Sequence, residues 1–201
     1  ALRCSPQAET RLDLDLWQMR PRRAAGRYSH KRNRENTLIS EPWRIEGESY
    51  GLHLLIDENC ELMRDHQTGR HVQGMVLFEA ARQSFLAVTE RFYLPQAGGG
   101  YYFVINNMSV NFSHFVFPIG ATIRYRVRES DCTRADRLHF IADIDLEQCG
   151  QVAASFVTDF TAFETDGISA LERRHASRAL QSYLGDVDAD ARVPAVEPEP
   201  A

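Results

Sequence analysis

Residues 65–93 read DHQTGRHVQGMVLFEAARQSFLAVTERFY, a polar loop followed by the clearest helix signal in the chain. From residue 75 onward this stretch is rich in good helix formers and contains no Gly or Pro. Residues 75–81 are apolar on nearly all sides except at Glu79, which indicates a buried helix. The second half becomes amphipathic, and Pro95 with the glycines at 98–100 ends it. We therefore expect one long helix enclosed by the rest of the domain.

Segments with strand character lie on both sides of this helix. They cover residues 37–40, 50–56, 101–117, 121–129, 138–146 and 152–163. Apolar and polar residues alternate in most of them, so one face of the sheet should be buried and the other wet. Short connections favour an antiparallel meander. Because the helix has no wet side at its start, the sheet must curl around it, which predicts a single α+β hotdog fold.

The ends of the chain differ in composition from this central part. Residues 1–28 are polar and Arg-rich, and we predict a flexible arm. The hotdog domain should then span residues 29–165. Residues 166–201 should form a short helix over 168–184 and an acidic, disordered tail from Val187.

Composition excludes several classes of protein. The 201 residues carry a formal net charge of −5, with 43% hydrophobic and 25% charged residues, as in an ordinary globular domain. This charge argues against a nucleic-acid partner, and no apolar run is long enough to cross a membrane. The first residues lack the apolar core of a signal peptide, so a cytoplasmic protein is expected.

The four cysteines form no C-x-x-C pair, so no metal site is predicted. They are Cys4, Cys60, Cys132 and Cys149. Cys132 and Cys149 could approach each other on neighbouring strands, but free thiols are the simpler interpretation.

Candidate catalytic residues cluster where the loop meets the helix. His66 and His71 are candidates because a histidine side chain can serve as a general base at neutral pH, although a lone loop histidine is more often a surface residue. Gly74 stands at the helix start, where free N–H groups could polarise a thioester carbonyl; the alternative is a tight helix entry.

Glu79 is a carboxylate inside an apolar run, so it needs a partner or a raised pKa. One interpretation is an intrahelical pair with Arg82 or Gln83, three and four residues further on. The other is a carboxylate at a substrate tunnel that works with a histidine. Spacing alone leaves both open.

The segment DHQTGRHVQGMVLFEAARQ resembles the signature of the A-factor biosynthesis hotdog family, an Asp-His-rich loop, Gly-Met and a helix opening with Glu-Ala-Ala-Arg-Gln. His30-Lys31, followed by residues 35–40, resembles the family's opening element. The resemblance covers roughly residues 29–165. It departs in two ways: well-known members carry two hotdog domains in one chain, and Gln73 stands where Pro is usual.

This resemblance implies acyl-thioester chemistry without a cofactor. Family members condense a β-ketoacyl group from acyl carrier protein with dihydroxyacetone phosphate, towards γ-butyrolactone signals. In related hotdog dehydratases a loop histidine and a helix Glu act together, and here His66 and Glu79 fall near that pair.

The mechanism expected from these features is an acyl transfer in secondary metabolism. His66 or His71 would deprotonate a hydroxyl, Glu79 would orient it, and the Gly74 amide would hold the thioester oxygen. The residues expected to contact substrate are Arg82, Gln83, Tyr102, Phe103, Met108 and Phe112. The expected partners are acyl carrier protein or acyl-CoA, a small hydroxylated acceptor and a second copy of the chain. A dehydratase, a thioesterase and a non-catalytic acyl-binding protein remain as alternatives.

Overall fold

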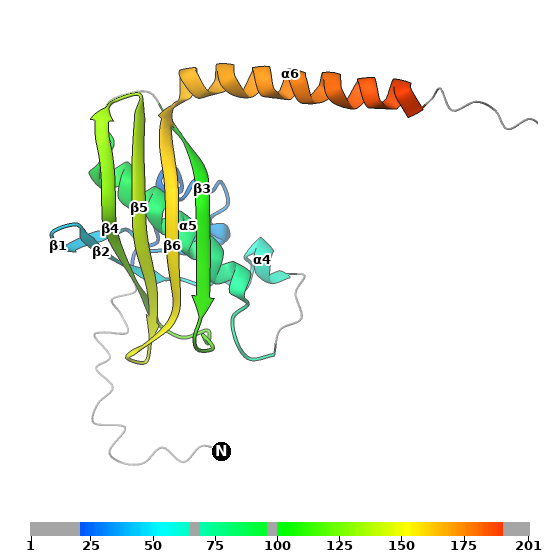
Figure 1. Ribbon diagram of the computed structural model, residues 1–201. Helices are drawn as coiled ribbons and strands as arrows, with labels where there is room; N and C mark the ends of the chain where they lie inside the picture. The colour runs from blue at the N-terminus through cyan, green and yellow to red at the C-terminus, as the bar shows by residue number, and fades with distance from the viewer. Residues whose placement is uncertain (1–20, 65–68, 96–99, 191–201) are drawn as a thin grey trace, which may run out of the picture.

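The computed structural model describes residues 21–64, 69–95 and 100–190, with side chains up to residue 185. Within these ranges the chain forms a six-stranded, wholly antiparallel sheet in the order β1-β2-β4-β5-β6-β3 (Figure 1). The strands are β1 (Trp43–Glu46), β2 (Ser49–Leu54), β3 (Tyr101–Phe112), β4 (Ala121–Arg134), β5 (Arg137–Gln148) and β6 (Gln151–Glu164).

The long helix α5 (Gly74–Phe92) packs along one face of this sheet (Figure 1). Its core contact is aromatic: the ring of Phe85 stacks on Phe160 at 4.3 Å, and Phe160 stacks on Phe140 at 5.3 Å. Residues 76 and 77 of its first turns are buried as predicted, but Met75 is 59% exposed. The predicted hotdog architecture, a central helix wrapped by an antiparallel sheet, is confirmed.

The hairpin between β5 and β6 turns through Cys149 and Gly150, both with positive φ. Two consecutive left-handed residues make the tight turn whose twist matches that of antiparallel strands. The other end of β6 leads directly into helix α6 (Thr165–Asp190), so the turn and α6 lie at opposite ends of the sheet (Figure 1).

The start of the domain differs from the sequence prediction. The predicted strand 37–40 forms only isolated bridges, from Ile39 to Leu54 and from Ser40 to Arg23. Ser40 and Leu38 do exchange backbone bonds with His53 and Leu55, but the Leu38 N–H donates to the Gln83 side chain at 2.8 Å, so the ladder is not continuous. Conversely, β1 was not predicted: its four residues alternate apolar and polar, but so short a run is a weak signal, and the strand is exposed along its whole length.

Two predicted segment limits also need correction. Arg23 of the expected arm bridges to Ser40 and donates to the carbonyl of Leu55, and Ala24 is buried in the core. The packed part of the chain therefore begins before residue 29. At the other end α6 continues to residue 190, past Val187, because its sequence holds good helix formers and no Pro. Residues 1–20 and 191–201 lie outside the described residues.

Three short helices complete the described fold: α3 (Gly26–Ser29), the 3-10 turn η1 (Arg34–Asn36) and α4 (Glu61–Arg64). Cys132 near the end of β4 and Cys149 at the β5–β6 turn lie at opposite ends of β5, so they do not meet within one chain. Cys60, Cys132 and Cys149 are free, and Cys4 lies outside the described residues. No helix among the described residues is long and apolar enough to cross a membrane.

Candidate functional site

The first turn of α5 is the centre of the candidate site. Gln73 precedes the helix but does not cap it; its side-chain amide donates instead to the carbonyl of Leu62. The side chain of Gln73 therefore leaves the first-turn N–H groups uncapped, and among these groups the Val76 N–H donates to the Gln73 backbone carbonyl at 3.1 Å. The ring of Phe112 lies so close to Gly74 that an added Cβ would stand 3.0 Å from it. Gly74 thus permits an aromatic side chain to approach the amino end of the helix.

His71 lies beside this turn. The Val72 N–H donates to the carbonyl of Val116 at 2.7 Å, which fastens the loop before α5 to the segment after β3. The His71 ring then packs on Phe115, with the ring centroids 4.7 Å apart. The structure therefore places His71, Gly74 and Phe112 at one end of the domain. His66, the other predicted base, lies outside the described residues.

Glu79 lies further along α5 and is tightly held. Its carboxylate accepts from Arg82 at 2.7 Å and 2.9 Å, from Gln83 at 2.9 Å, and pairs with Lys31 at 2.9 Å. Burial alone would raise the pKa of Glu79, but the hydrogen bonds and charges of these donors outweigh burial and lower it to about 2. The intrahelical pair that the sequence left open is confirmed. A carboxylate with so low a pKa is a poor proton donor or acceptor at neutral pH.

Gln83 is fully buried and serves the fold. Its amide oxygen accepts from the Leu38 N–H, and its amide nitrogen donates to the carbonyl of Asn36 at 2.8 Å as well as to Glu79. The side chain thus ties residues 36–38 to α5. It has no exposed surface for the substrate contact predicted from the sequence.

The His30-Lys31 pair belongs to the same region. Lys31 reaches Glu79, while His30 contacts Glu90 at 3.1 Å and packs edge-on against Phe103. The opening element therefore covers the side of α5, and its charged groups are paired with helix carboxylates. Arg82 is likewise engaged with Glu79.

The residues predicted to line an acyl tunnel are spread along β3. Phe103 packs on Phe85 and Phe160 in the core, and Met108 is half-buried against it. Phe112 is 50% exposed at the carboxyl end of the strand. Tyr102, at the other end, is 44% exposed, and a hydrogen bond with Glu172 of α6 raises its pKa. Only Phe112 among these residues lies beside Gly74.

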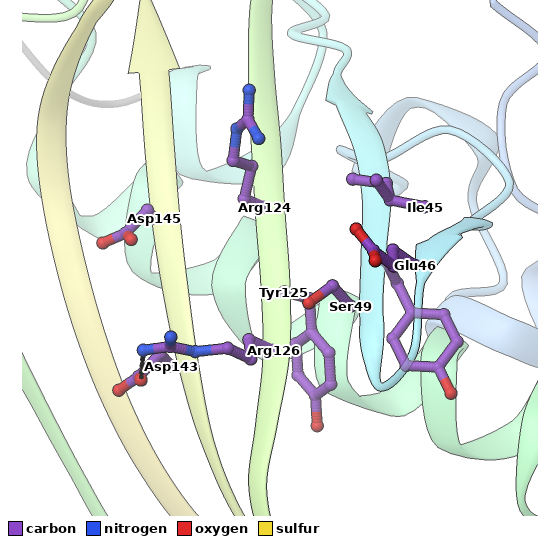
Figure 2. A pocket seen from close by; sticks show the side chains of 9 residues that line it. Ile45, Glu46, Ser49, Arg124, Tyr125, Arg126, Asp143 and Asp145 are labelled. Carbon is purple, nitrogen blue, oxygen red and sulfur yellow. Dashed lines mark hydrogen bonds and ion pairs between the residues drawn. The ribbon is translucent and has the colours of Figure 1, made fainter.

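A surface hollow of about 320 Å³ lies on the outer face of the sheet, and Figure 2 shows the side chains that line it. It contains none of the predicted site residues. Its two arginines are held in close pairs: Arg126 to Asp143 at 2.7 Å within the hollow, and Arg124 to Glu147 at 2.8 Å beside it. Arg128 also binds Asp143, so this buried carboxylate has two cationic partners. Asp145, which also lines the hollow, accepts from the Ser155 hydroxyl at 2.7 Å.

A polar cluster that was not predicted from the sequence lies at the carboxyl end of α5. The Tyr50 hydroxyl donates to Tyr93 at 3.0 Å, and Tyr93 donates to Glu48. Burial raises the pKa of both tyrosines; the bonds with Glu48 and Tyr50 add to this for Tyr93, whereas the bond with Tyr93 acts in the opposite direction on Tyr50. Glu48 and Tyr50 lie near one another in the sequence, but only the fold brings Tyr93 to them.

Among the described residues, no group of three or more His, Cys, Asp or Glu side chains could hold a metal ion. The amino end of α5 can instead supply backbone donors, an aromatic wall and one histidine. These groups can hold an oxygen that gains negative charge and accept one proton.

An antiparallel sheet wrapped around one long helix defines a hotdog protein. Residues 12–164 match the A-factor biosynthesis hotdog domain (AfsA), and the chain belongs to that family. A comparison with the curated proteins finds no relative.

Solved structures with similar folds include three bacterial proteins. A mutant thioesterase from Pseudomonas aeruginosa is 16% identical with a TM-score of 0.49, and the match covers 68% of this chain and 89% of that chain. A thioesterase from Haemophilus influenzae is 13% identical with a TM-score of 0.44, and the match covers 63% of this chain and 78% of that chain. The E. coli PaaI protein of the phenylacetic acid degradation operon is 14% identical with a TM-score of 0.42, and the match covers 61% of this chain and 77% of that chain. At such identities and TM-scores these similarities say nothing about the reaction.

Proposed function

We propose that this protein is an enzyme that transfers a β-ketoacyl group from a carrier thioester to a small hydroxylated acceptor. The observation that carries the proposal is the amino end of α5, where Gly74 lies against the Phe112 ring and no side chain of Gln73 caps the helix. A thioester carbonyl placed there would meet backbone donors, and its acyl chain would meet Phe112 and the Phe156 ring 6.2 Å beyond. Membership of the A-factor biosynthesis hotdog family supports this substrate class.

The proposed step is a substitution at the thioester carbon. The acceptor hydroxyl attacks that carbon, a new C–O bond forms and the C–S bond breaks. A histidine takes the hydroxyl proton and returns it to the departing thiolate, so no proton or electron pair is left over. His71 lies three residues before Gly74, in a loop that the Val72–Val116 bond holds in place, and we assign it as the base, with His66 as the alternative.

Glu79 takes a different part from the one the sequence suggested. Its two oxygens already accept from Arg82, Gln83 and Lys31, so we assign it as a positioning residue rather than an acid or base. The cluster of Lys31, Glu79 and Arg82 carries one net positive charge. This charge would attract the phosphate of a pantetheine arm on a carrier protein or coenzyme A.

Two copies are proposed to pair through β3. Within the described residues β3 is a sheet edge of full length, whereas the opposite edge, β1, is short and irregular. An open edge is a template for pairing. Tyr102 and Phe112 stand about 33 Å apart on one strand, at about 3.3 Å per residue. Antiparallel pairing of two β3 strands would bring Tyr102 of one copy towards Phe112 of the other.

A product analysis tests the proposed reaction. The full chain is incubated with β-ketoacyl, β-hydroxyacyl and plain acyl thioesters of coenzyme A and of carrier protein, with and without dihydroxyacetone phosphate. The proposal requires an ester that forms only from the β-ketoacyl thioester and the acceptor. Free acid formed without acceptor would instead identify a thioesterase, and loss of water from the β-hydroxyacyl thioester a dehydratase.

A second candidate function has one observation in its favour. The full set of partners around Glu79 removes the acid–base carboxylate of a dehydratase-like site, as expected for an acyl-binding protein without catalysis. Binding of an acyl thioester without any turnover in the same assay would support this candidate and overturn the transfer.

A further inference from the structure

Helix α6 leaves the domain at the β3 edge. The Thr165 N–H donates to the carbonyl of Gly100 at 3.0 Å, and Ile168 is buried at 8% exposure. The start of α6 also contacts β3, and Glu172, one turn further along, raises the pKa of Tyr102 on that strand. Beyond that residue the helix runs past β3 and away from its own sheet (Figure 1). We call residues 173–185 the α6 arm.

The α6 arm carries exposed apolar side chains. Leu180, Tyr183 and Leu184 are 59%, 67% and 52% exposed. Ile168, Glu172, Ala176 and Leu180 follow at four-residue spacing, so they form one row along the helix. That row begins on the domain and ends with apolar groups that have no cover within the described chain.

A second exposed apolar cluster lies at the other end of the sheet. The aromatic loop, residues 113–120, runs from β3 to β4 across the ends of β6 and β5. Phe115, Phe117 and Ile119 of this loop are 70%, 43% and 57% exposed. Gln148 at the end of β5 holds the loop by accepting from the Phe117 N–H at 2.9 Å and donating to its carbonyl at 3.0 Å.

We infer that the α6 arm of each copy packs on the aromatic loop of a second copy. This inference rests on the β3 pairing proposed above. The two-fold axis of an antiparallel β3 pair places the amino end of one β3 beside the carboxyl end of the other. The α6 arm, which starts at the amino end of β3, then passes over the end of the second copy that bears the aromatic loop.

The lengths agree with this arrangement. At about 1.5 Å per residue, Leu180 and Leu184 lie about 22 Å and 28 Å along α6 from Thr165. At about 4.8 Å per strand, β5 and β4 of the second copy lie about 19 Å and 24 Å from β6 of the first. Phe117 and Ile119 lie at the ends of these same two strands, since Gln148 of β5 bonds to both. The two exposed clusters therefore fall opposite each other.

The contact would complete the candidate site. Phe115 of the aromatic loop packs on His71, and Phe112 just before the loop packs on Gly74. An arm from the second copy would lie over these rings and exclude water from the entrance to the site. Each site would then consist of α5 and its loop from one copy and of α6 from the other.

Site-directed cross-linking tests this contact through a native thiol. Ala176 lies about 17 Å along α6, at about 1.5 Å per residue, which is opposite the β5–β6 turn of a second copy. Cys149 of that turn is exposed. In a chain with Cys4→Ser and Cys132→Ser, Ala176→Cys should cross-link to Cys149 with a short bismaleimide and give a covalent dimer. Within one chain the two positions lie at opposite ends of the sheet and cannot react (Figure 1).

Arg174→Cys is the matched control, because position 174 faces the other side of the helix. We expect at least about tenfold less covalent dimer from it, since cross-linking needs close approach. Light scattering of the protein without cross-linker measures whether it is a dimer or a monomer. A dimer without the 176–149 cross-link overturns the inference about the α6 arm and leaves the β3 pairing standing. A monomer overturns both, and neither reading depends on the proposed reaction.

Substitution on the arm gives an independent measurement. Leu180→Glu should raise the dimer dissociation constant at least about tenfold, because it would bury a charge against Phe117 and Ile119. Arg178→Glu, on the opposite face, should leave it unchanged. The melting temperature of the separated monomer should not move, since Leu180 is exposed there. An unchanged dissociation constant for Leu180→Glu would contradict the contact.

Discussion

Glu79 contributes to folding through its charge. Its pKa falls from 4.5 to about 2 on folding, so its stabilisation is complete above pH 4.5 and is lost as the pH falls towards 2. A shift of this size corresponds to at most about 3 kcal/mol. We predict that Glu79→Gln lowers the free energy of unfolding at pH 7 by about 2 to 3 kcal/mol and reduces the loss of stability between pH 5 and pH 2. Urea unfolding at several pH values measures both effects.

Glu90→Gln provides the control for this prediction. Glu90 lies on the same helix, and its partner among the described residues is His30, on a more exposed surface. Its substitution should cost less than about 1 kcal/mol. If Glu79→Gln were as stable as the natural chain while turnover fell about a hundredfold, Glu79 would act in proton transfer after all.

Gly74 allows a test of the proposed site that separates function from folding. In Gly74→Ala the new Cβ would stand 3.0 Å from the Phe112 ring, which is half exposed on an edge strand and can move aside. We expect a stability change below about 1 kcal/mol. Turnover should fall at least about tenfold, because the methyl group fills the space proposed for the thioester. Thermal melts and initial rates with a β-ketoacyl thioester measure the two effects.

Phe112→Ala in the same chain is the companion variant. It removes the ring that the new methyl group would meet, so it should restore part of the turnover lost in Gly74→Ala. Normal turnover in Gly74→Ala alone would remove Gly74 from the site.

Among the helices and strands, the sequence predicted those whose apolar residues recur with a regular period. The apolar start of α5 and the alternating strands β4 to β6 appear in the structure with limits close to those expected. The sequence could not show β1, which is held by pairing with β2 and by the Trp43 ring over Gly51 rather than by burial of alternate residues. It also could not show that a side chain, Gln83, takes the backbone bonds of residues 36–38.

For the candidate site, the sequence showed which residues lie together on α5 but not what role each of them has. A buried carboxylate with Arg and Gln on the same helix face was visible, and two of the three donors to Glu79 were named in advance. The third, Lys31, lies on another element, and only the fold brings it to α5. Because all three donors together set the pKa of Glu79, spacing along one helix could not distinguish an ion pair from an acid–base group.

The edge strand β3 permits a test of the proposed pairing. Ile105 is 40% exposed and stands next to a bulge near the middle of the strand. A lysine on an open edge discourages pairing of sheets. We predict that Ile105→Lys raises the dimer dissociation constant at least about tenfold, as measured by sedimentation, with little change in the fold. Val157→Lys, on the outer face of the neighbouring strand, should leave the dimer intact; equal effects of both variants would argue against an interface at β3.

For the whole molecule, only the start of α6 contributes to the core of the domain. The rest of this helix lies outside the core. Ile168 is buried, whereas the described side chains from residue 169 to 185 are at least partly exposed. We therefore predict that removal of residues 187–201 changes the melting temperature by less than about 2 °C. Removal of residues 166–201 should lower it by about 4 °C or more, because the buried Ile168 side chain is lost. Calorimetry at one protein concentration compares the two truncations. A large drop in melting temperature on removal of residues 187–201 alone would show that the acidic end of the chain packs on the domain.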